Sequence, residues 1–113
     1  MDVKDAVLEY LWQIAEQTDG HFELFDPQQQ KMLALNLMGD IADERIFRSV
    51  EDETIVCSDM MSADGRIYDI DFIVTDTHTN TPLVRDVNIH KMEEYPRYEW
   101  ALQDGVCLRT PVP

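Results

Sequence analysis

Basic residues are scarce in this sequence of 113 residues. Nine Lys and Arg stand against 23 Asp and Glu, which gives a formal net charge of −14 at pH 7. A protein that binds nucleic acid or an anionic membrane surface needs a cationic face to neutralise phosphates or headgroups. The charge therefore argues against both functions. It favours a basic protein as the partner, because a negative field speeds encounter with a cationic surface.

Cysteine is also rare. The two cysteines, Cys57 and Cys107, lie far apart in the chain, with no CxxC spacing and no nearby pair of histidines. Such a spacing offers neither a zinc clip nor a disulfide framework. We therefore expect reduced thiols and no metal or other cofactor.

Long apolar runs are missing, and none approaches the ~20 residues needed to cross a bilayer. The first ten residues, MDVKDAVLEY, lack the basic region and apolar run of a secretory signal. These absences predict a cytoplasmic protein of bacterial or phage-like style. The length allows one domain over 1–113, and 44% hydrophobic residues argue against disorder. The proline-containing end, 110–113, is expected to be a frayed tail.

The apolar residues near the N-terminus follow a helical period. They are Val3, Ala6, Val7, Tyr10, Leu11 and Ile14. Asp2 can cap the N-terminus of this helix, and Gly20 can adopt the left-handed conformation that closes it. Leu8, Trp12 and Ala15 form a second stripe beside the first, so the broad apolar arc predicts a helix that lies against a sheet.

After Gly20 the apolar period changes to two, which is typical of strands. The expected extended segments are 21–25, 33–37, 45–50, 54–61, 66–75 and 83–92, with a last short one at 98–102 or 106–109. A helix over 28–38 is the alternative to the second strand, because that segment is rich in good helix formers. We predict the strand.

The order of these elements predicts an α+β fold. Strands joined by short turns pair antiparallel, and one face of the resulting sheet needs a cover. We therefore expect one N-terminal helix packed on a curved antiparallel meander of four to six strands. A small β-barrel with an N-terminal helix is the alternative.

This order resembles the cystatin-like architecture and the related NTF2-like cones, in which a curved sheet wraps a helix. Three stretches are also similar to an uncharacterised small bacterial domain family: DGRIYDIDF at 64–72, IHK at 89–91 and RYEW at 97–100. Cystatins inhibit papain-like proteases through a QxVxG loop, and the nearest string, QDGV at 103–106, lacks that spacing. The resemblance therefore implies a fold and no inhibitory activity.

Polar residues recur at every second position of two expected strands. Asp69 and Asp71 leave the same face of their strand and could hold a hard cation such as Ca²⁺ or Mg²⁺. Asp86, Asn88 and His90 continue this face on the next strand. A solvated polar surface without a metal is the alternative, and we favour it because two carboxylates make a poor cage.

His90 close to a carboxylate is an arrangement for general acid/base chemistry, because the carboxylate raises the imidazole pKa and fixes its tautomer. A surface histidine without a chemical role is the favoured alternative. No GxSxG motif or similar signature marks a nucleophile.

Aromatic residues gather near the C-terminus, where Tyr95, Tyr98 and Trp100 surround Arg97. These residue types dominate binding hot spots, so an exposed cluster would form a partner-binding surface. The favoured alternative is that Tyr98 and Trp100 close the core over the helix.

The position of Asp59 depends on the turn at Asp64 and Gly65. A two-residue turn places Asp59 opposite Ile70 and points it into the core. A three-residue loop with Gly65 as a bulge sets Asp59 opposite Asp69, where like charges destabilise the pair. We therefore predict the inward arrangement, with a buried Asp59 as the leading candidate for a functional residue or else part of a structural hydrogen-bond network.

Two functions remain open. The favoured one is a non-enzymatic, acidic interaction module that docks on a basic protein. The alternative is a small ligand-binding or enzymatic cone, with a pocket between helix and sheet that contains polar groups such as Asp59 or Tyr68. An enzyme must bury ionisable residues on the inward face of the sheet, whereas a binding module keeps that face apolar.

Overall fold

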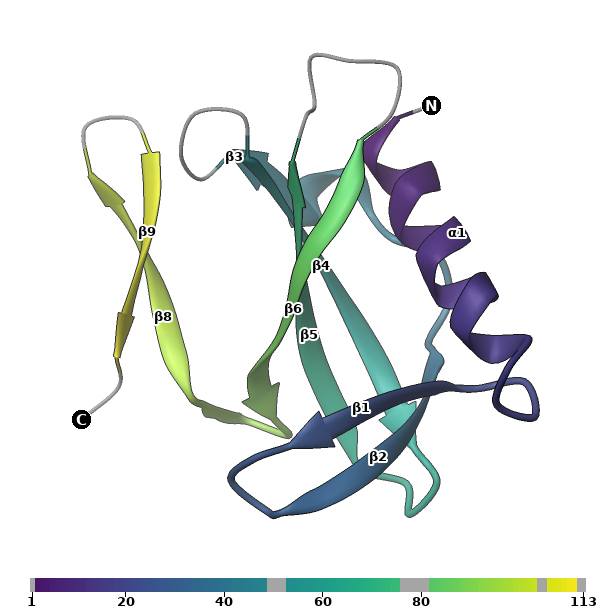
Figure 1. The fold of residues 1–113 in the computed structure, drawn as a ribbon. Helices are drawn as coiled ribbons and strands as arrows, with labels where there is room; N and C mark the ends of the chain where they lie inside the picture. Colours follow the sequence, from purple (N-terminus) through teal and green to yellow (C-terminus); the bar gives the residue numbers. More distant parts are fainter. Residues whose placement is uncertain (1, 49–52, 76–81, 104–105, 112–113) are drawn as a thin grey trace.

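The computed structural model describes residues 2–48, 53–75, 82–103 and 106–111. The chain begins with helix α1 and continues almost entirely as strands (Figure 1). The elements are α1 (Val3–Ala15), β1 (Phe22–Asp26), β2 (Lys31–Leu37), the 3-10 helix η1 (Asp43–Arg45), β3 (Ile46–Arg48), β4 (Glu53–Ser62), β5 (Ile67–Thr75), β6 (Leu83–Met92), β7 (Tyr95–Pro96), β8 (Tyr98–Gln103) and β9 (Val106–Pro111).

Helix α1 begins at the predicted cap and ends at Ala15, five residues before Gly20. The Asp2 carboxylate accepts a hydrogen bond of 2.8 Å from the backbone N–H of Asp5, as an N-cap does. After the helix, Gly20 adopts a φ of +90° and its N–H donates to the carbonyl of Ala15. Ala6, Val7 and Leu11 are buried on the predicted apolar face.

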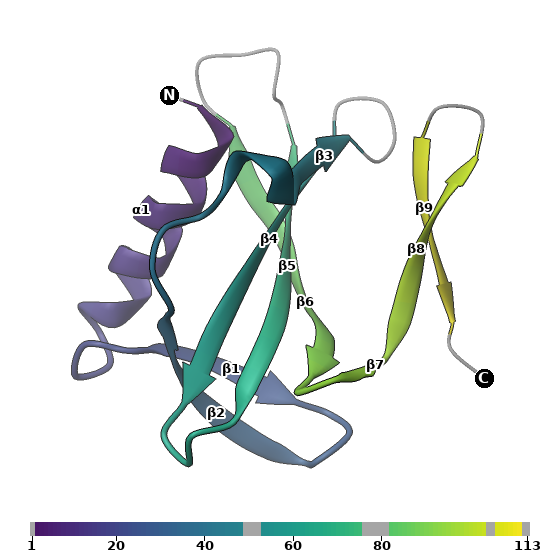
Figure 2. The same ribbon diagram turned by 180° about the vertical axis from the view of Figure 1, so that it is seen from behind.

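The strands form a strongly curled antiparallel sheet around α1 (Figures 1 and 2). Its order is β1-β2-β4-β5-β6-β7, with β3 added beside β4. This arrangement confirms the predicted α+β class with a curved meander. The sheet has seven strands in the described part of the chain, more than the four to six expected. Segment 28–38 contains β2, which confirms the strand over the helix.

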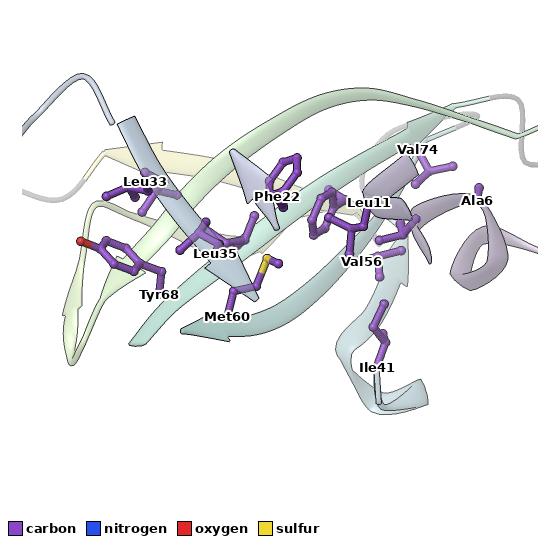
Figure 3. Packing of buried hydrophobic residues seen from close by; sticks show 14 residues of the cluster. Ala6, Leu11, Phe22, Leu33, Leu35, Ile41, Val56, Met60, Tyr68 and Val74 are labelled. Atoms are coloured by element: carbon purple, nitrogen blue, oxygen red, sulfur yellow. The ribbon is translucent and has the colours of Figure 1, made fainter. Parts of the chain in front are cut away.

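The main core lies between α1 and the inner face of the sheet (Figure 3). Leu33 and Leu35 alternate along β2 and are both buried. Tyr10 of the helix makes an edge contact with the rings of Phe22 and Phe72, with centroids 5.9 and 6.4 Å away. The apolar side chains of the helix and the strands therefore meet as the two periods predict.

The second face of the sheet is covered as well. Strands β8 and β9 form a separate antiparallel hairpin on the side opposite α1 (Figure 2). Ile55, Cys57 and Ile73 are buried there, packed against Phe47 and Trp100. The prediction of one solvated face is therefore wrong for the central strands β4 and β5.

The hairpin also corrects the expectation for the C-terminal end. Thr110 and Pro111 belong to β9, opposite Glu99 and Tyr98 of β8. The predicted frayed tail is wrong at these two positions, because pairing with β8 holds them. Residues 112 and 113 lie outside the described part of the chain.

The turn between β4 and β5 overturns the inward prediction for Asp59. Ser62 and Arg66 close a three-residue loop in which Gly65 has a φ of +87°. This loop sets Asp59 opposite Asp69, and Met60 opposite Tyr68. The side chain of Asp59 is half exposed on the second face. The physical reason is that Gly65 readily adopts the left-handed conformation required by this longer loop.

Candidate functional site

The second face of the sheet contains a buried group of polar side chains. We call Cys57, Asp69, Asp71 and His90 the polar cluster. Strand alternation puts Asp69 and Asp71 on one face of β5, and pairing with β4 places Cys57 directly opposite Asp71. One sulfur or carboxylate oxygen atom from each of these three side chains lies within 4.8 Å of the others.

Alternation along β6 puts His90 on the same face as Asn88, and a β-bulge at this point leaves it beside Asp69 and Asp71. Asp69 pairs with Lys91 and Ile70 pairs with Ile89, which leaves His90 as an extra residue between them. The extra residue of a bulge is left unpaired in this way. The Nδ1 atom of His90 lies 3.5 Å from Oδ2 of Asp69 and 3.6 Å from Oδ2 of Asp71.

Asp71 is the most deeply buried member of the cluster. Its side chain is 0% exposed. Its Oδ2 atom accepts hydrogen bonds from the hydroxyl of Tyr98 at 2.6 Å and from Nε1 of Trp100 at 2.8 Å. The ring of Tyr98 also stacks on His90, with centroids 4.8 Å apart. The β8 aromatics therefore hold the carboxylate and the imidazole in position.

Arg45 lies at the exposed edge of the cluster. Its Nη2 atom donates to Oδ1 of Asp69 at 2.9 Å, and its guanidinium contacts Asp59 at 3.4 Å. In the observed register Asp59 lies opposite Asp69, and Arg45 supplies a positive charge to both carboxylates. This contact removes the repulsion that led to the inward prediction for Asp59.

The surroundings shift the pKa values of three ionisable groups in or beside the polar cluster. Burial, and then the negative charge of Asp71, raise the pKa of the Cys57 thiol far above its usual range and likewise raise the pKa of the Tyr98 hydroxyl. For His90, burial lowers the pKa, but contact with Asp69 and the charge of Asp71 outweigh it, so the pKa is raised. Cys57 and Tyr98 therefore stay protonated at neutral pH in this environment, and neither is an activated nucleophile.

The residues predicted for the polar surface are only partly brought together. Asp69, Asp71 and His90 share one face, as expected, but the β8–β9 hairpin buries it. Asp86 is exposed, and Asn88 is half-buried. The favoured solvated arrangement is therefore wrong for Asp71 and His90, because a second layer lies over them.

Of the predicted partner-binding residues, Tyr95 is strongly exposed, at 74%. Tyr98 is buried and Trp100 half-buried, on the second face rather than over the helix. The alternative that they close the core over the helix is also wrong. The hairpin that carries them crosses to the other side of the sheet.

Arg97 holds the chain at the point where it leaves the sheet and crosses to the second face. Its guanidinium makes two hydrogen bonds to the buried carboxylate of Asp26, of 2.6 and 2.9 Å. Burial raises the pKa of Asp26, but hydrogen bonds from Arg97, Gln29 and the Gln28 backbone outweigh it and hold the pKa at about 2. Arg97 is therefore an anchor between β1 and the start of β8, and its proposed place on an exposed surface is wrong.

Tyr68 lies in the main core and is fully buried. Its hydroxyl accepts a hydrogen bond of 2.9 Å from Nε2 of Gln29. In Figure 3 its hydroxyl points toward the edge of the cluster of core side chains. The hydroxyl of Tyr68 is therefore already hydrogen-bonded to a residue of the β1–β2 turn.

A shallow groove lies between α1 and the neighbouring strands, with a volume of about 190 Å³. Its lining is mostly apolar and includes Leu8, Leu11, Trp12, Leu35, Leu37 and Met60. Trp12 is 63% exposed and Leu8 is 41% exposed. The sequence pattern placed both in a stripe against the sheet, and the structure instead puts them at the border of the groove.

A second cleft, of about 470 Å³, lies beside the β8–β9 hairpin. Leu24, Val87 and Ile89 contribute apolar walls, while Tyr98 and Arg109 line the hairpin side. The guanidinium of Arg109 lies over the ring of Tyr98, 5.2 Å from its centroid. Tyr98 therefore separates this cleft from the polar cluster.

In the part of the chain that the structure describes, no helix has both the length and the apolar character to span a membrane. Comparisons of the chain with protein-family models, with curated proteins and with solved structures found no match. The resemblance to cystatin-like and NTF2-like proteins therefore stays a prediction.

Proposed function

We propose that this protein is a non-enzymatic module that binds a basic protein partner through the groove beside α1. The observation that carries the proposal is the 63% exposure of Trp12 at the border of an apolar groove, in a chain of net charge −14. Exposed tryptophans are enriched among the residues that dominate binding energy. We expect Trp12 to be the main anchor.

Charge surrounds this apolar border on the helix. Asp5, Leu8, Trp12 and Glu16 follow one another at spacings of three or four residues, so they form one row along α1. All four are exposed. The two apolar side chains are therefore flanked by carboxylates, which suits a partner segment with a large apolar side chain between basic ones.

The opposite border of the groove has the same character. Met38, which directly follows the groove residue Leu37, is 41% exposed, and Asp40 is exposed after it. The nearby Lys4 donates a hydrogen bond of 2.8 Å to Asp43, so its charge is already paired. The field at this end of the helix is therefore negative, and it complements a cationic partner.

The alternative, an enzymatic or ligand-binding cone, has less support. Asp59 lies on the other face of the sheet, and the Tyr68 hydroxyl is bonded to Gln29. The groove beside the helix is small and largely apolar. These features favour a binding surface over a polar pocket between helix and sheet.

A peptide titration tests the proposal. The probe is a synthetic amphipathic peptide of lysine and leucine, with a glutamate and leucine peptide of the same pattern as control. We expect the lysine peptide to shift the Trp12 indole signal in NMR spectra, with an affinity that falls as salt is added. The glutamate peptide should leave the signal in place.

Two variants locate the binding surface. Trp12→Ala should weaken binding at least about tenfold, as expected for a hot spot. Met32→Ala is the matched control, because Met32 is a similarly exposed apolar residue, at 57%, on the β1–β2 hairpin. Equal losses in both variants, or an affinity unaffected by salt, would contradict the proposal.

A further inference from the structure

The polar cluster contains buried polar atoms without partners. Among the described residues, Oδ1 of Asp71 and both ring nitrogens of His90 have no hydrogen-bond partner, although all three atoms are buried. Buried polar groups almost always have a partner, because an unpaired one loses its hydration without compensation. The cluster therefore needs an additional binding partner for these atoms.

The spacing of the atoms indicates what that partner is. In a tetrahedral site with ligand bonds of 2.0–2.3 Å, the ligand atoms lie about 3.3–3.8 Å from one another. His90 Nδ1 lies 3.5 Å from Oδ2 of Asp69, a separation that fits such a site. It also lies 3.6 Å from Oδ2 of Asp71, the oxygen that Tyr98 and Trp100 already bind, so the neighbouring Oδ1 is the Asp71 atom left for an ion. The Cys57 sulfur lies within 4.8 Å of oxygens from the same two carboxylates. The three side chains within this distance of one another do not include His90, so binding of one ion by all four requires side-chain rotation.

We propose that Cys57, Asp69, Asp71 and His90 bind one divalent transition-metal ion, and that Zn²⁺ is the best match. Binding of the metal would displace the thiol proton of Cys57 to solvent. The resulting thiolate and an imidazole together select a transition metal, whereas Ca²⁺ and Mg²⁺ prefer oxygen ligands throughout. Four side chains complete the tetrahedral coordination of a structural zinc site. The metal would hold β4, β5 and β6 together under the hairpin.

Neighbouring residues already orient the ligands. Tyr98 and Trp100 donate to Oδ2 of Asp71, which leaves its Oδ1 for the metal. Arg45 donates to Oδ1 of Asp69 and leaves Oδ2 toward His90. Hydrogen bonds of this kind are typical of groups that support metal ligands.

Charge also favours a cation. The donors to the fully buried Asp71 carboxylate, Tyr98 and Trp100, are neutral. A buried carboxylate is stable only when a cation or a dense set of donors compensates its lost hydration. A divalent ion would supply this charge. Asp69 and Arg45, 15% and 33% exposed, leave a route to solvent at one edge.

Cobalt binding to the full chain tests the site. Co²⁺ replaces Zn²⁺ in tetrahedral sites and is coloured, and a bound thiolate adds a charge-transfer band. After treatment with a chelator, the protein should bind one equivalent of Co²⁺ with both spectral features, and Zn²⁺ should remove them. Either metal should raise the thermal unfolding midpoint.

Matched variants identify the ligands. Cys57→Ser should abolish the charge-transfer band, whereas Cys107→Ser, which leaves Cys57 as the chain's one cysteine, should retain it. Asp71→Asn should lower the Zn²⁺ affinity more than Tyr98→Phe, for which we expect a loss of about 10- to 100-fold. Asp64→Asn, in the exposed β4–β5 turn, should have no effect.

The absence of a tetrahedral cobalt spectrum in the wild-type protein would overturn the proposal. Such a result would mean that a protonated His90 pairs with the two carboxylates instead. Survival of the charge-transfer band in Cys57→Ser would overturn it equally. Should Cys57→Ser fail to fold, the spectrum of Cys107→Ser decides, because any thiolate band there must come from Cys57.

Discussion

The two faces of the curled sheet bury different kinds of side chain. The inner face, under α1, is a continuous apolar core built around residues such as Leu35, Ile70 and Phe72. The outer face, under the β8–β9 hairpin, combines a small apolar group with the buried carboxylate of Asp71 and the imidazole of His90. The inner face is therefore stabilised mainly by apolar burial, with polar contacts such as Gln29–Tyr68 at its edge, whereas the centre of the outer face depends on specific polar partners.

The two faces should also respond differently to substitution. An apolar face tolerates substitutions that conserve volume, and its loss of stability scales with the cavity that a substitution leaves. A polar face depends on each donor and acceptor, because one missing partner leaves a buried group unpaired. The candidate metal ligands lie on this more demanding face, and the proposed docking groove lies beside the apolar one.

Arg97→Met gives the largest expected effect. It leaves the Asp26 carboxylate buried without its cation, which costs about 3–5 kcal/mol, and it releases the anchor at the start of β8. Urea unfolding measures the loss. The double variant Asp26→Asn with Arg97→Met should recover much of it, because no buried charge remains; a double variant as unstable as the single one would contradict this explanation.

Tyr98→Phe tests the outer face alone. It removes the 2.6 Å hydrogen bond to Asp71 and leaves the ring in place. A hydrogen bond to a charged group contributes about 1.5–3 kcal/mol, so we expect a loss of that size in urea unfolding. Tyr95→Phe, on a residue 74% exposed, should change nothing. Equal small effects would mean that the outer face does not depend on its polar partners.

Acid should weaken the ion pair between Asp26 of β1 and Arg97 at the start of β8. The pKa of Asp26 is lowered from 3.8 to about 2 in the folded protein, so the folded state binds this proton less readily than the unfolded state. The resulting stability, roughly 2 kcal/mol, is present above about pH 4 and is lost as the pH falls toward 2. Unfolding free energies measured across this range should fall less steeply in Asp26→Asn than in the wild-type protein.

Asp59→Asn should have the smallest effect. Its side chain is half exposed and pairs with Arg45 at 3.4 Å, and such pairs contribute less than about 1 kcal/mol. Urea unfolding of the variant and of the wild-type protein measures the difference. A loss of unfolding free energy above about 2 kcal/mol would mean that Asp59 is buried. Asp59 and Asp71, on the same face, would then no longer differ in burial.

Most of the fold could be predicted from local patterns. The 3.6-residue period and the cap at Asp2 located α1, and the alternation of Leu33 and Leu35 identified β2 despite good helix formers around them. These signals lie within single elements, where sequence spacing maps directly onto geometry. The curved meander with one helix followed from them.

Alternation predicted that Asp69, Asp71 and His90 share one face, but it predicted neither the burial of that face nor the place of Cys57 in the polar cluster. Asp69 and Asp71 alternate with apolar residues, as in a strand with one wet face, and the packing of the distant hairpin is what buries them. The bulge at His90, which leaves this residue unpaired with β5, has no sequence signal. Cys57 and His90 are 33 positions apart, so no short metal-binding motif could reveal them.

The length of the three-residue loop at 63–65 determines which side chains of β4 and β5 lie together on the outer face of the sheet. Side chains alternate along a strand, so the length of this loop decides which set of β4 residues lies beside which set of β5 residues. Deleting one residue would exchange the two sets on one strand and, if β4 turns over, bring Asp59 together with Cys57 among the buried apolar side chains of the inner face. Surface loops usually accept such length changes during evolution. This one is expected to resist them, although its own residues are exposed to solvent.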